Sequence, residues 1–349
     1  MNEYVMNGAA FGSIAARLLA ANFSPRVLRP YTLADGRCVV ANARGDGVEM
    51  VHNASLGYDD WKQIDNTVQE TLKSRLTVVN MLVRRGLVYN MGNGMGKTVL
   101  QSDAISGMTA ASLSMIPAVK GPGDSVAFEP YLLPLPIASK PFTVDIRTLN
   151  NSRSGGTPLD TAGVSAATRV VAEAIEDSFC ANQTFPAAGG TVYSLVNQPD
   201  RNTVNLTTAW SDPGVDGDDV LADVLEMKQA ALNDSAYGPY ALLVPAGWSS
   251  KLDTIRNATS DKTTRQCILE IEGIQECLIA PRLPADEAVL VQLTPDVIQV
   301  VDAMAVTPLQ WETDGGMLQH FLVAGIQVPR IRADYNGASG VVHLRAAVL

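Results

Sequence analysis

Histidine and cysteine are scarce in this sequence, and the few that occur are scattered. They are His52, His320 and His343, with Cys38, Cys180, Cys267 and Cys277. No two cysteines form a C-x-x-C pair, so the ligand spacing of a zinc site is missing. No apolar run is long enough to span a membrane, and the N-terminus lacks the charged-then-apolar order of a signal peptide. We therefore expect no metal site, no membrane segment and reduced, mostly buried thiols in a cytoplasmic protein.

Charged residues are also few, at 18% of the 349 residues, below the usual quarter. The formal net charge is −10, which argues against broad phosphate binding by clustered cations. It does not exclude a container around nucleic acid, because a shell only has to enclose the polymer. The N-terminal stretch differs, since Arg17, Arg26 and Arg29 face few acids there. At 46% hydrophobic residues, the chain can bury the core of two or three lobes.

A glycine-rich segment from Gly92 to Thr98 resembles a nucleotide-binding P-loop. The pattern G-x-x-x-x-G-K-[ST] requires glycine at position 91, where Met91 stands. A P-loop also leads from a strand into a helix, whereas a strand pattern resumes at Val99. We expect a hairpin with two short strands around a glycine-rich tip, and no nucleotide binding.

Neither the histidines nor the acids form a visible catalytic constellation. No G-x-S-x-G elbow accompanies a histidine. Neighbouring helical residues do not face each other, so adjacent acids serve acid–base chemistry poorly. These acid pairs are Asp59–Asp60, Glu176–Asp177 and Asp218–Asp219, of which the first and third read as helix starts. Trp210, Trp248 and Trp311 are isolated and are interpreted as packing residues. We expect neither an enzyme nor a cofactor.

Hydrophobic periodicity divides the chain into segments. An arm broken by proline and glycine precedes an amphipathic helix that opens at Asp59–Asp60 and stops at Gly86. A long projecting two-stranded loop, too poor in periodic apolar residues to build its own core, follows it. A strand within 131–149 precedes a long helix, capped by Thr157 with Pro158 at its first position. Another helix starts at Asp218–Asp219, and strands are expected at 288–293, 297–301, 317–331 and 341–344.

This order of parts resembles the major capsid proteins of tailed phages, which have the Hong Kong 97 capsid fold, and their cellular relatives the encapsulins. The resemblance rests on the W-x-x-I-D motif at Trp61–Asp65, on the helix entry at Ser152–Thr161 and on Tyr237–Tyr240. It rests also on the closing strands with Gln310–Trp311 and Val328–Pro329. It covers about residues 58–343.

The resemblance implies an α+β capsid fold with an arm, an E-loop, a P-domain with a spine helix and sheet, and an A-domain. The implied boundaries are 1–57 for the arm, 58–86 for the first helix, 87–127 for the E-loop, 128–185 for the P-domain with its spine helix, 186–282 for the A-domain and 283–349 for the closing P-domain strands. Pentamers and hexamers of this subunit would close an icosahedral virion capsid in the host cytoplasm. The implied partners are a separate scaffolding protein, a portal, decoration proteins, and enclosed double-stranded DNA bound without sequence specificity.

The long arm and the long stretch at 193–210 favour a phage capsid over an encapsulin-type nanocompartment shell, which stays the alternative. The arm is shorter than the fused scaffolding extension of some relatives, so the scaffold is expected to be separate. We predict inter-subunit contacts at Phe11, Leu18, Met91, Gly94, Lys97, Leu100 and Met115. The arm arginines Arg17, Arg26 and Arg29 are predicted to face DNA.

Overall fold

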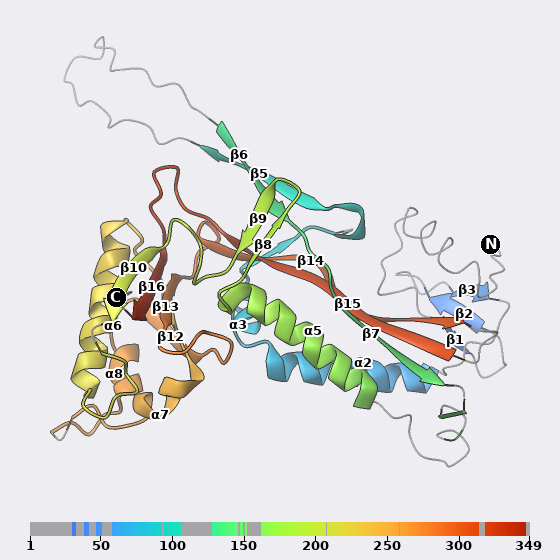
Figure 1. Cartoon of the computed structure of the whole chain (residues 1–349), viewed down its shortest axis with the longest axis horizontal. Coiled ribbons are helices and arrows are strands. Elements are labelled where there is room, and N and C mark those ends of the chain that lie inside the picture. The colour runs from blue at the N-terminus through green and yellow to red at the C-terminus, as the bar shows by residue number, and fades with distance from the viewer. Residues whose placement is uncertain are drawn as a thin grey trace, which may run out of the picture.

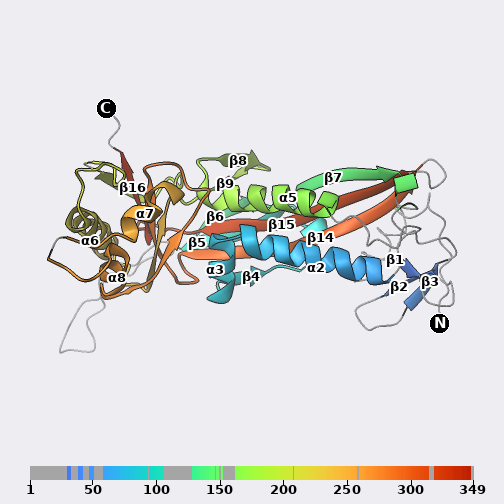
Figure 2. The ribbon, with the colours of Figure 1, turned by 90° about the horizontal axis from the view of Figure 1, so that it is seen from below.

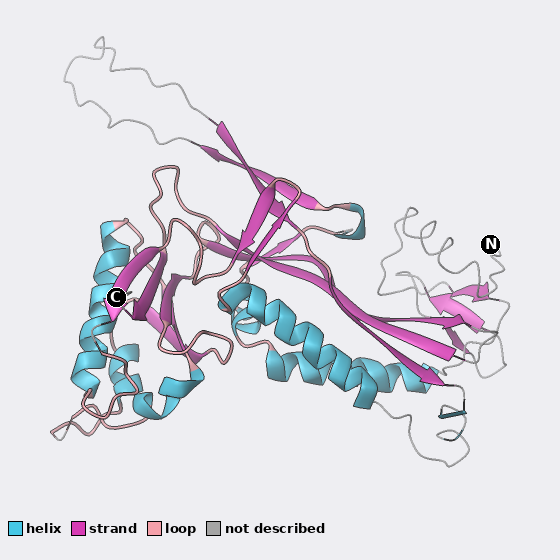
Figure 3. Cartoon of the chain, viewed as in Figure 1, coloured by secondary structure: helices cyan, strands magenta, loops and turns pink. Residues whose placement is uncertain are grey.

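An elongated body of helices and long strands adjoins a more compact lobe in the computed structural model (Figures 1 and 3). The structure describes residues 30–32, 38–41, 47–50, 58–92, 94–105, 128–145, 147–148, 151, 162–206, 208–257, 259–313 and 318–346. These ranges contain both helices and strands, as expected of an α+β fold.

A four-stranded sheet runs the length of the elongated body in the order β4-β14-β15-β7. Its strands are β4 (Val88–Asn90), β7 (Ala138–Asp145), β14 (Ile298–Thr313) and β15 (Leu318–Ile331). The two long strands pair antiparallel from Ile298↔Ile331 to Thr313↔Leu318. The predicted strands at 297–301 and 317–331 are therefore present, and the first is much longer than expected.

Two helices lie side by side against one face of this sheet (Figures 1 and 2). They are α2 (Tyr58–Arg75) and α5 (Ala162–Cys180). The apolar stripe of α5 repeats every three or four residues, as a helix facing a core requires. Its buried members include Val164, Ala167, Val171, Ile175 and Phe179. The long helix is thus confirmed, while its predicted cap at Thr157 and Pro158 lies outside the described residues.

The helix predicted from Asp59 to Gly86 is instead two helices. After α2, the chain breaks at Leu76 and Thr77 and continues as α3 (Val78–Arg84). Gly86 ends the segment with a φ of 74°, a left-handed conformation that suits glycine. The predicted stop is correct, and the break has a cause elsewhere in the chain, described below.

The compact lobe holds a mixed five-stranded sheet in the order β10-β16-β13-β11-β12. Its strands are β10 (Asn202–Leu206), β11 (Tyr240–Val244), β12 (Ile274–Ile279), β13 (Ala288–Gln292) and β16 (Val341–Ala346). Its helical segments are α6 (Gly217–Asn233), η4 (Ala246–Trp248), α7 (Ser249–Leu252) and α8 (Thr264–Leu269). The predicted strands at 288–293 and 341–344 are confirmed as β13 and β16.

Three smaller sheets complete the fold. They are β1-β2-β3 (Pro30–Thr32, Cys38–Ala41 and Gly47–Met50), the pair β5 (Val99–Ile105) and β6 (Phe128–Pro134), and the pair β8 (Thr184–Ala187) and β9 (Gly190–Tyr193). The strand predicted within 131–149 is therefore two strands, since β6 and β7 belong to different sheets. Pro134 ends the first of them. Proline has no amide hydrogen to donate to a strand ladder, so it suits a strand end.

The hairpin predicted around Gly92–Thr98 is wrong. β4 pairs in parallel with β14, whereas β5 pairs antiparallel with β6. The two strands that flank the glycine-rich segment thus belong to different sheets. The short 3₁₀ helix η3 (Gly94–Gly96) carries the chain from one sheet to the other.

Candidate inter-subunit surface

The β5–β6 hairpin projects from the body and is the most extended described feature of the subunit (Figure 1). Its register runs from Val99↔Pro134 at the base to Ile105↔Phe128 at the outer end. At the base, Leu100, Leu133 and Leu135 are buried in a cluster with Val301 and Val328 of the long strands. At the outer end, Phe128 is 64% exposed. A packed base therefore carries an outer end where the aromatic side chain of Phe128 is left exposed by the described residues.

A second hairpin braces the base. Glycine at position 190 lets β9 approach the backbone of β6 closely, because a Cβ there would lie 2.0 Å from the carbonyl oxygen of Leu132. Val192 of the same strand is 3% exposed and packs into the cluster that contains Leu133. The β8–β9 hairpin therefore restricts the angle at which β5–β6 leaves the body.

The predicted contact residues of the glycine-rich segment occupy different environments. Gly94 is buried, and a Cβ on it would lie 2.6 Å from the Cβ of Ala303, so glycine permits a close backbone approach. Lys97 is exposed, and Met91 is half-buried against the cluster at the hairpin base. Leu100 is 9% exposed, so most of its side chain is already covered within its own subunit. Contacts of these residues with neighbours stay predictions.

The other predicted site residues lie outside the described residues. They are Phe11, Leu18, Met115, Arg17, Arg26 and Arg29. Around Gly92–Thr98 the chain enters β5, a strand, and not the helix whose N-terminus a P-loop needs. The geometry of this segment therefore agrees with the interpretation that it binds no nucleotide.

Glu176, half of an acid pair dismissed for catalysis, explains the break between α2 and α3. Its carboxylate is fully buried and lies at the N-terminus of α3. Oε1 accepts hydrogen bonds from the Thr77 amide at 3.1 Å, the Thr77 hydroxyl at 2.6 Å and the Val78 amide at 2.6 Å. A side chain of α5 thus caps a helix about a hundred residues earlier, where a carboxylate also suits the helix dipole. Burial raises the pKa of this carboxyl group, and the hydrogen bonds from Thr77 and Val78 counter that effect.

Asp177, the next residue, points to a different partner. It receives two parallel hydrogen bonds at 2.5 Å from Nε and Nη2 of Arg282, the geometry of a strong bidentate ion pair. The hydrogen bonds to Asp177 raise the pKa of Arg282. The last turns of α5 therefore fix both α3 and the chain that follows β12. In α6, Asp216 caps the helix and Asp219 completes a capping box, so the prediction that Asp218–Asp219 marks a helix start is confirmed.

Each of the two described histidines has a structural partner. In His343, which is buried, Nδ1 accepts from Arg201 Nε at 3.2 Å, so Nε2 carries the proton toward Glu287 Oε2 at 3.0 Å. His320 lies 2.7 Å from Thr313 Oγ1 through Nε2 and stacks on Trp311 with 5.3 Å between ring centroids. Neither has a serine hydroxyl as hydrogen-bond partner within the described ranges, and His52 lies outside them.

The tryptophans only partly behave as predicted. Trp210 and Trp248 are buried and pack together, with centroids 4.5 Å apart, which confirms a packing role. Trp311 is 37% exposed, so it is not a core residue. Its ladder partner is His320. The next residue, Phe321, packs with α2 and α5, and side chains alternate along a strand, so Trp311 lies on the sheet face opposite the helices.

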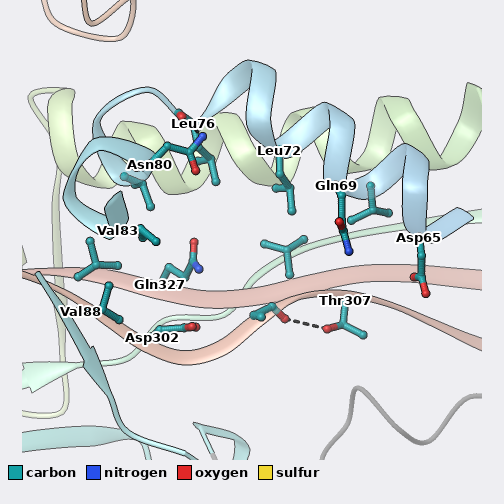
Figure 4. A pocket seen from close by; sticks show the side chains of 15 residues that line it. Asp65, Gln69, Leu72, Leu76, Asn80, Val83, Val88, Asp302, Thr307 and Gln327 are labelled. Carbon is teal, nitrogen blue, oxygen red and sulfur yellow. Dashed lines mark hydrogen bonds between the residues drawn. The ribbon is translucent and has the colours of Figure 1, made fainter. Parts of the chain in front are cut away.

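A groove of about 490 Å³ separates α2 and α3 from the long strands (Figure 4). Leu72, Leu76 and Val83 line the helical side, and Val88 lies among the strands opposite. Gln327 extends from the sheet into the groove, and its Oε1 is buried without a hydrogen-bond partner. The groove therefore mixes apolar side chains with polar ones, which include Asp65, Asn80 and Thr307.

No group of three or more histidine, cysteine or acidic side chains is arranged to hold a metal ion in the part of the chain that the structure describes. Among the described helices, none combines the length and the apolar character that crossing a bilayer demands. The described geometry thus offers packing and polar anchoring, and it brings together no catalytic constellation.

Similar folds occur in solved shells. A virus-like particle from Pyrococcus furiosus matches with a TM-score of 0.59 and 18% identity, over 82% of this chain and 99% of that one. The capsid of the Myoviridae phage XM1 matches with a TM-score of 0.59 and 11% identity, over 76% and 91%. The capsid of a native GTA particle matches with a TM-score of 0.55 and 10% identity, over 76% and 90%. The chain therefore has the Hong Kong 97 type of capsid fold, as its sequence led us to expect.

No curated protein is similar to this sequence. A family model, described as a family of unknown function (DUF6260), matches residues 51–344. That match spans the elongated body, the projecting hairpin and the compact lobe. The chain belongs to this family, DUF6260.

Proposed function

We propose that the chain is the shell-forming subunit of an icosahedral particle, and specifically the major capsid protein of a tailed phage. The observation that carries the proposal is its fold, which matches a phage capsid chain over 91% of that chain's length. The projecting hairpin with an exposed apolar end supports a role in assembly, because such surface in a free subunit favours association. The role is mechanical and not catalytic.

The proposed domains follow the capsid fold. Residues 87–127 are the E-loop, 186–282 the A-domain, and 128–185 with 283–349 the P-domain. Residues 1–57 form the arm, followed by the first helix at 58–86. The described β5–β6 hairpin crosses the proposed boundary at residue 127, because its second strand is β6. The arm and the E-loop would cover neighbours, as in obligate interfaces that bury large areas.

An encapsulin-type nanocompartment is the second candidate, and one observation favours it. The virus-like particle from Pyrococcus furiosus is covered over 99% of its length, more fully than the phage capsid. Coverage of this chain does not separate the two candidates, because it is 82% for the virus-like particle and 76% for the phage capsid. The phage reading is supported by two features of the sequence, the long arm and the stretch at 193–210.

The proposed partners are further copies in pentamers and hexamers, a separate scaffolding protein, a portal and decoration proteins. The enclosed polymer would be double-stranded DNA, held without sequence-specific contacts within a virion capsid assembled in the host cytoplasm. The net charge of −10 is compatible with a shell that confines DNA mechanically. Arg17, Arg26 and Arg29 of the arm are proposed to face it.

Expression and electron microscopy test the proposal. The full-length chain would be produced alone and together with a candidate scaffolding protein, and particles would be counted by negative stain. Capsomers or closed shells are expected, and DNA protected from nuclease after packaging would favour a phage capsid. Shells that form without scaffold and enclose protein would favour an encapsulin. A stable monomer under every condition would contradict both.

A further inference from the structure

Two arginines at the end of β15 converge on one neutral acceptor. Arg330 lies in the strand opposite Gln299, and Arg332 follows two residues later. Arg330 Nη1 and Arg332 Nη2 both donate to Gln299 Oε1, each at 3.3 Å. These are long hydrogen bonds for a guanidinium group. Arg332 Nη2 also donates to the carbonyl oxygen of Pro295, so both of these acceptor atoms are neutral.

No acidic counter-ion pairs with either arginine in the described part of the chain. Among the described residues no carboxylate lies within 4.0 Å of either guanidinium, although Asp296 and Asp334 are close in sequence. Arg330 is only 8% exposed, and the Nε atoms of both arginines are buried without a hydrogen-bond partner. Burial lowers the pKa of Arg330, and the charge of Arg332 lowers it further. A buried charge normally has an oppositely charged partner, and the described residues supply none to this pair.

Two tyrosines lie near the guanidinium group of Arg330. The Tyr89 ring of β4 lies beside Arg330, with 5.3 Å from its centroid to the guanidinium carbon. Tyr131 of β6 is near enough to interact electrostatically with Arg330. Burial raises the pKa of Tyr131, so its hydroxyl keeps its proton and can donate. Tyr89 is 39% exposed and Arg332 is partly exposed, which leaves a route from solvent.

We propose that Arg330 and Arg332, with Tyr89 and Tyr131, form a binding site for an oxyanion, namely a phosphate or carboxylate group. Guanidinium forks and phenol hydroxyls are donors that both groups accept. The anion comes either from solution or from an acidic side chain of a second copy of this chain. Because β4, β6 and β15 meet here, the bound anion joins the base of the projecting hairpin to the long sheet.

Thermal unfolding of the full-length chain in inorganic phosphate tests the site. The midpoint is followed against phosphate concentration and against chloride at equal ionic strength, because a specific ligand stabilises the folded state in a saturable way. Arg332→Gln removes one charged donor at a partly exposed position, and loss of such a bond weakens phosphate affinity roughly tenfold or more. Arg169→Gln, on the exposed side of α5, is the matched control and keeps the wild-type response.

The response expected of the wild type is a saturable rise in phosphate beyond that in chloride, reduced in Arg332→Gln. Tyr89→Phe keeps the ring and removes one donor, so its loss of affinity is smaller. A response present in free subunits and absent from assembled particles assigns the site to a neighbour's carboxylate, and one present in both assigns it to a free anion. Equal shifts in phosphate and chloride, or an undiminished response in Arg332→Gln, overturn the proposal.

Discussion

Replacing Glu176 should be among the most destabilising single changes in the elongated body. Its Oε1 accepts three hydrogen bonds at the start of α3, from Thr77 and Val78. Alanine leaves those donors buried and unpaired, and each costs about 1–3 kcal/mol. The Thr77 hydroxyl can rotate toward another acceptor, so we expect a total loss of about 3–5 kcal/mol. That is a large share of the roughly 5–15 kcal/mol that holds a domain folded.

Glutamine at the same position removes the negative charge and keeps nearly the same side-chain shape. Its amide oxygen can still accept from Val78 and Thr77, whereas its NH₂ group meets the Val79 amide, which now donates to Oε2 at 3.4 Å. We expect Glu176→Gln to cost about 1–2 kcal/mol. Urea unfolding of unassembled subunits, followed by circular dichroism, measures both variants. Glu173→Ala, one turn earlier on the partly exposed side of α5, is the control, and a loss in Glu176→Ala no larger than in Glu173→Ala would refute the reasoning.

The pH dependence gives an independent check. Burial raises the pKa of Glu176 in the folded state, so the folded protein binds more protons than the unfolded chain above about pH 4.3, the ordinary glutamate value. The free energy of unfolding contributed by this group therefore falls as the pH rises from there through the raised pKa. The stability difference between wild type and Glu176→Gln should be largest in acid and shrink toward neutral pH. A difference that grows with pH would mean that the hydrogen bonds outweigh burial.

Three further predictions concern the projecting hairpin and the arm. Gly190→Ala should keep the circular dichroism of the subunit but reduce closed particles, because the new Cβ meets the Leu132 carbonyl; Gly247→Ala, with nothing within 4 Å, should assemble normally. Neither the wild type nor Lys97→Ala should bind ATP. Measurable ATP binding by the wild type that is lost in Lys97→Ala would contradict this prediction. Deleting residues 1–50 should permit folding yet weaken shell closure; normal numbers of equally heat-resistant particles in the electron microscope would show that the arm is dispensable.

The elements with a strong local pattern were predictable. The stripe of α5 and the strands β13, β15 and β16 follow from spacing alone, because each buries one continuous face. The register of pairing was less accessible, since it depends on residues far apart in the chain. β4 illustrates this: its partner β14 begins about two hundred residues later, so a nearby glycine-rich segment was mistaken for a hairpin turn.

The break between α2 and α3 was equally hidden. Leu76 and Val79 continue the apolar stripe, and both are buried as a single helix would predict. What interrupts the helix is the buried carboxylate of Glu176, which satisfies the amides at the start of α3 and makes a new helix start favourable there. In the sequence, Glu176 and Asp177 are two adjacent acids with no sign of different roles. In the fold, Glu176 accepts from the start of α3 and Asp177 pairs with Arg282.

Glycine at positions 94 and 190 shows what the projecting hairpin requires of the subunit. Neither residue has the positive φ of a turn glycine among the described residues, yet each lies where a Cβ would collide with another strand. Both close approaches occur at the base of the hairpin, next to the cluster that buries Leu100 and Leu133. The base is thus fixed within the subunit, whereas Phe128 at the outer end of the described hairpin is exposed. We therefore predict that substitutions toward the outer end of this hairpin change assembly while leaving the stability of the subunit almost unchanged.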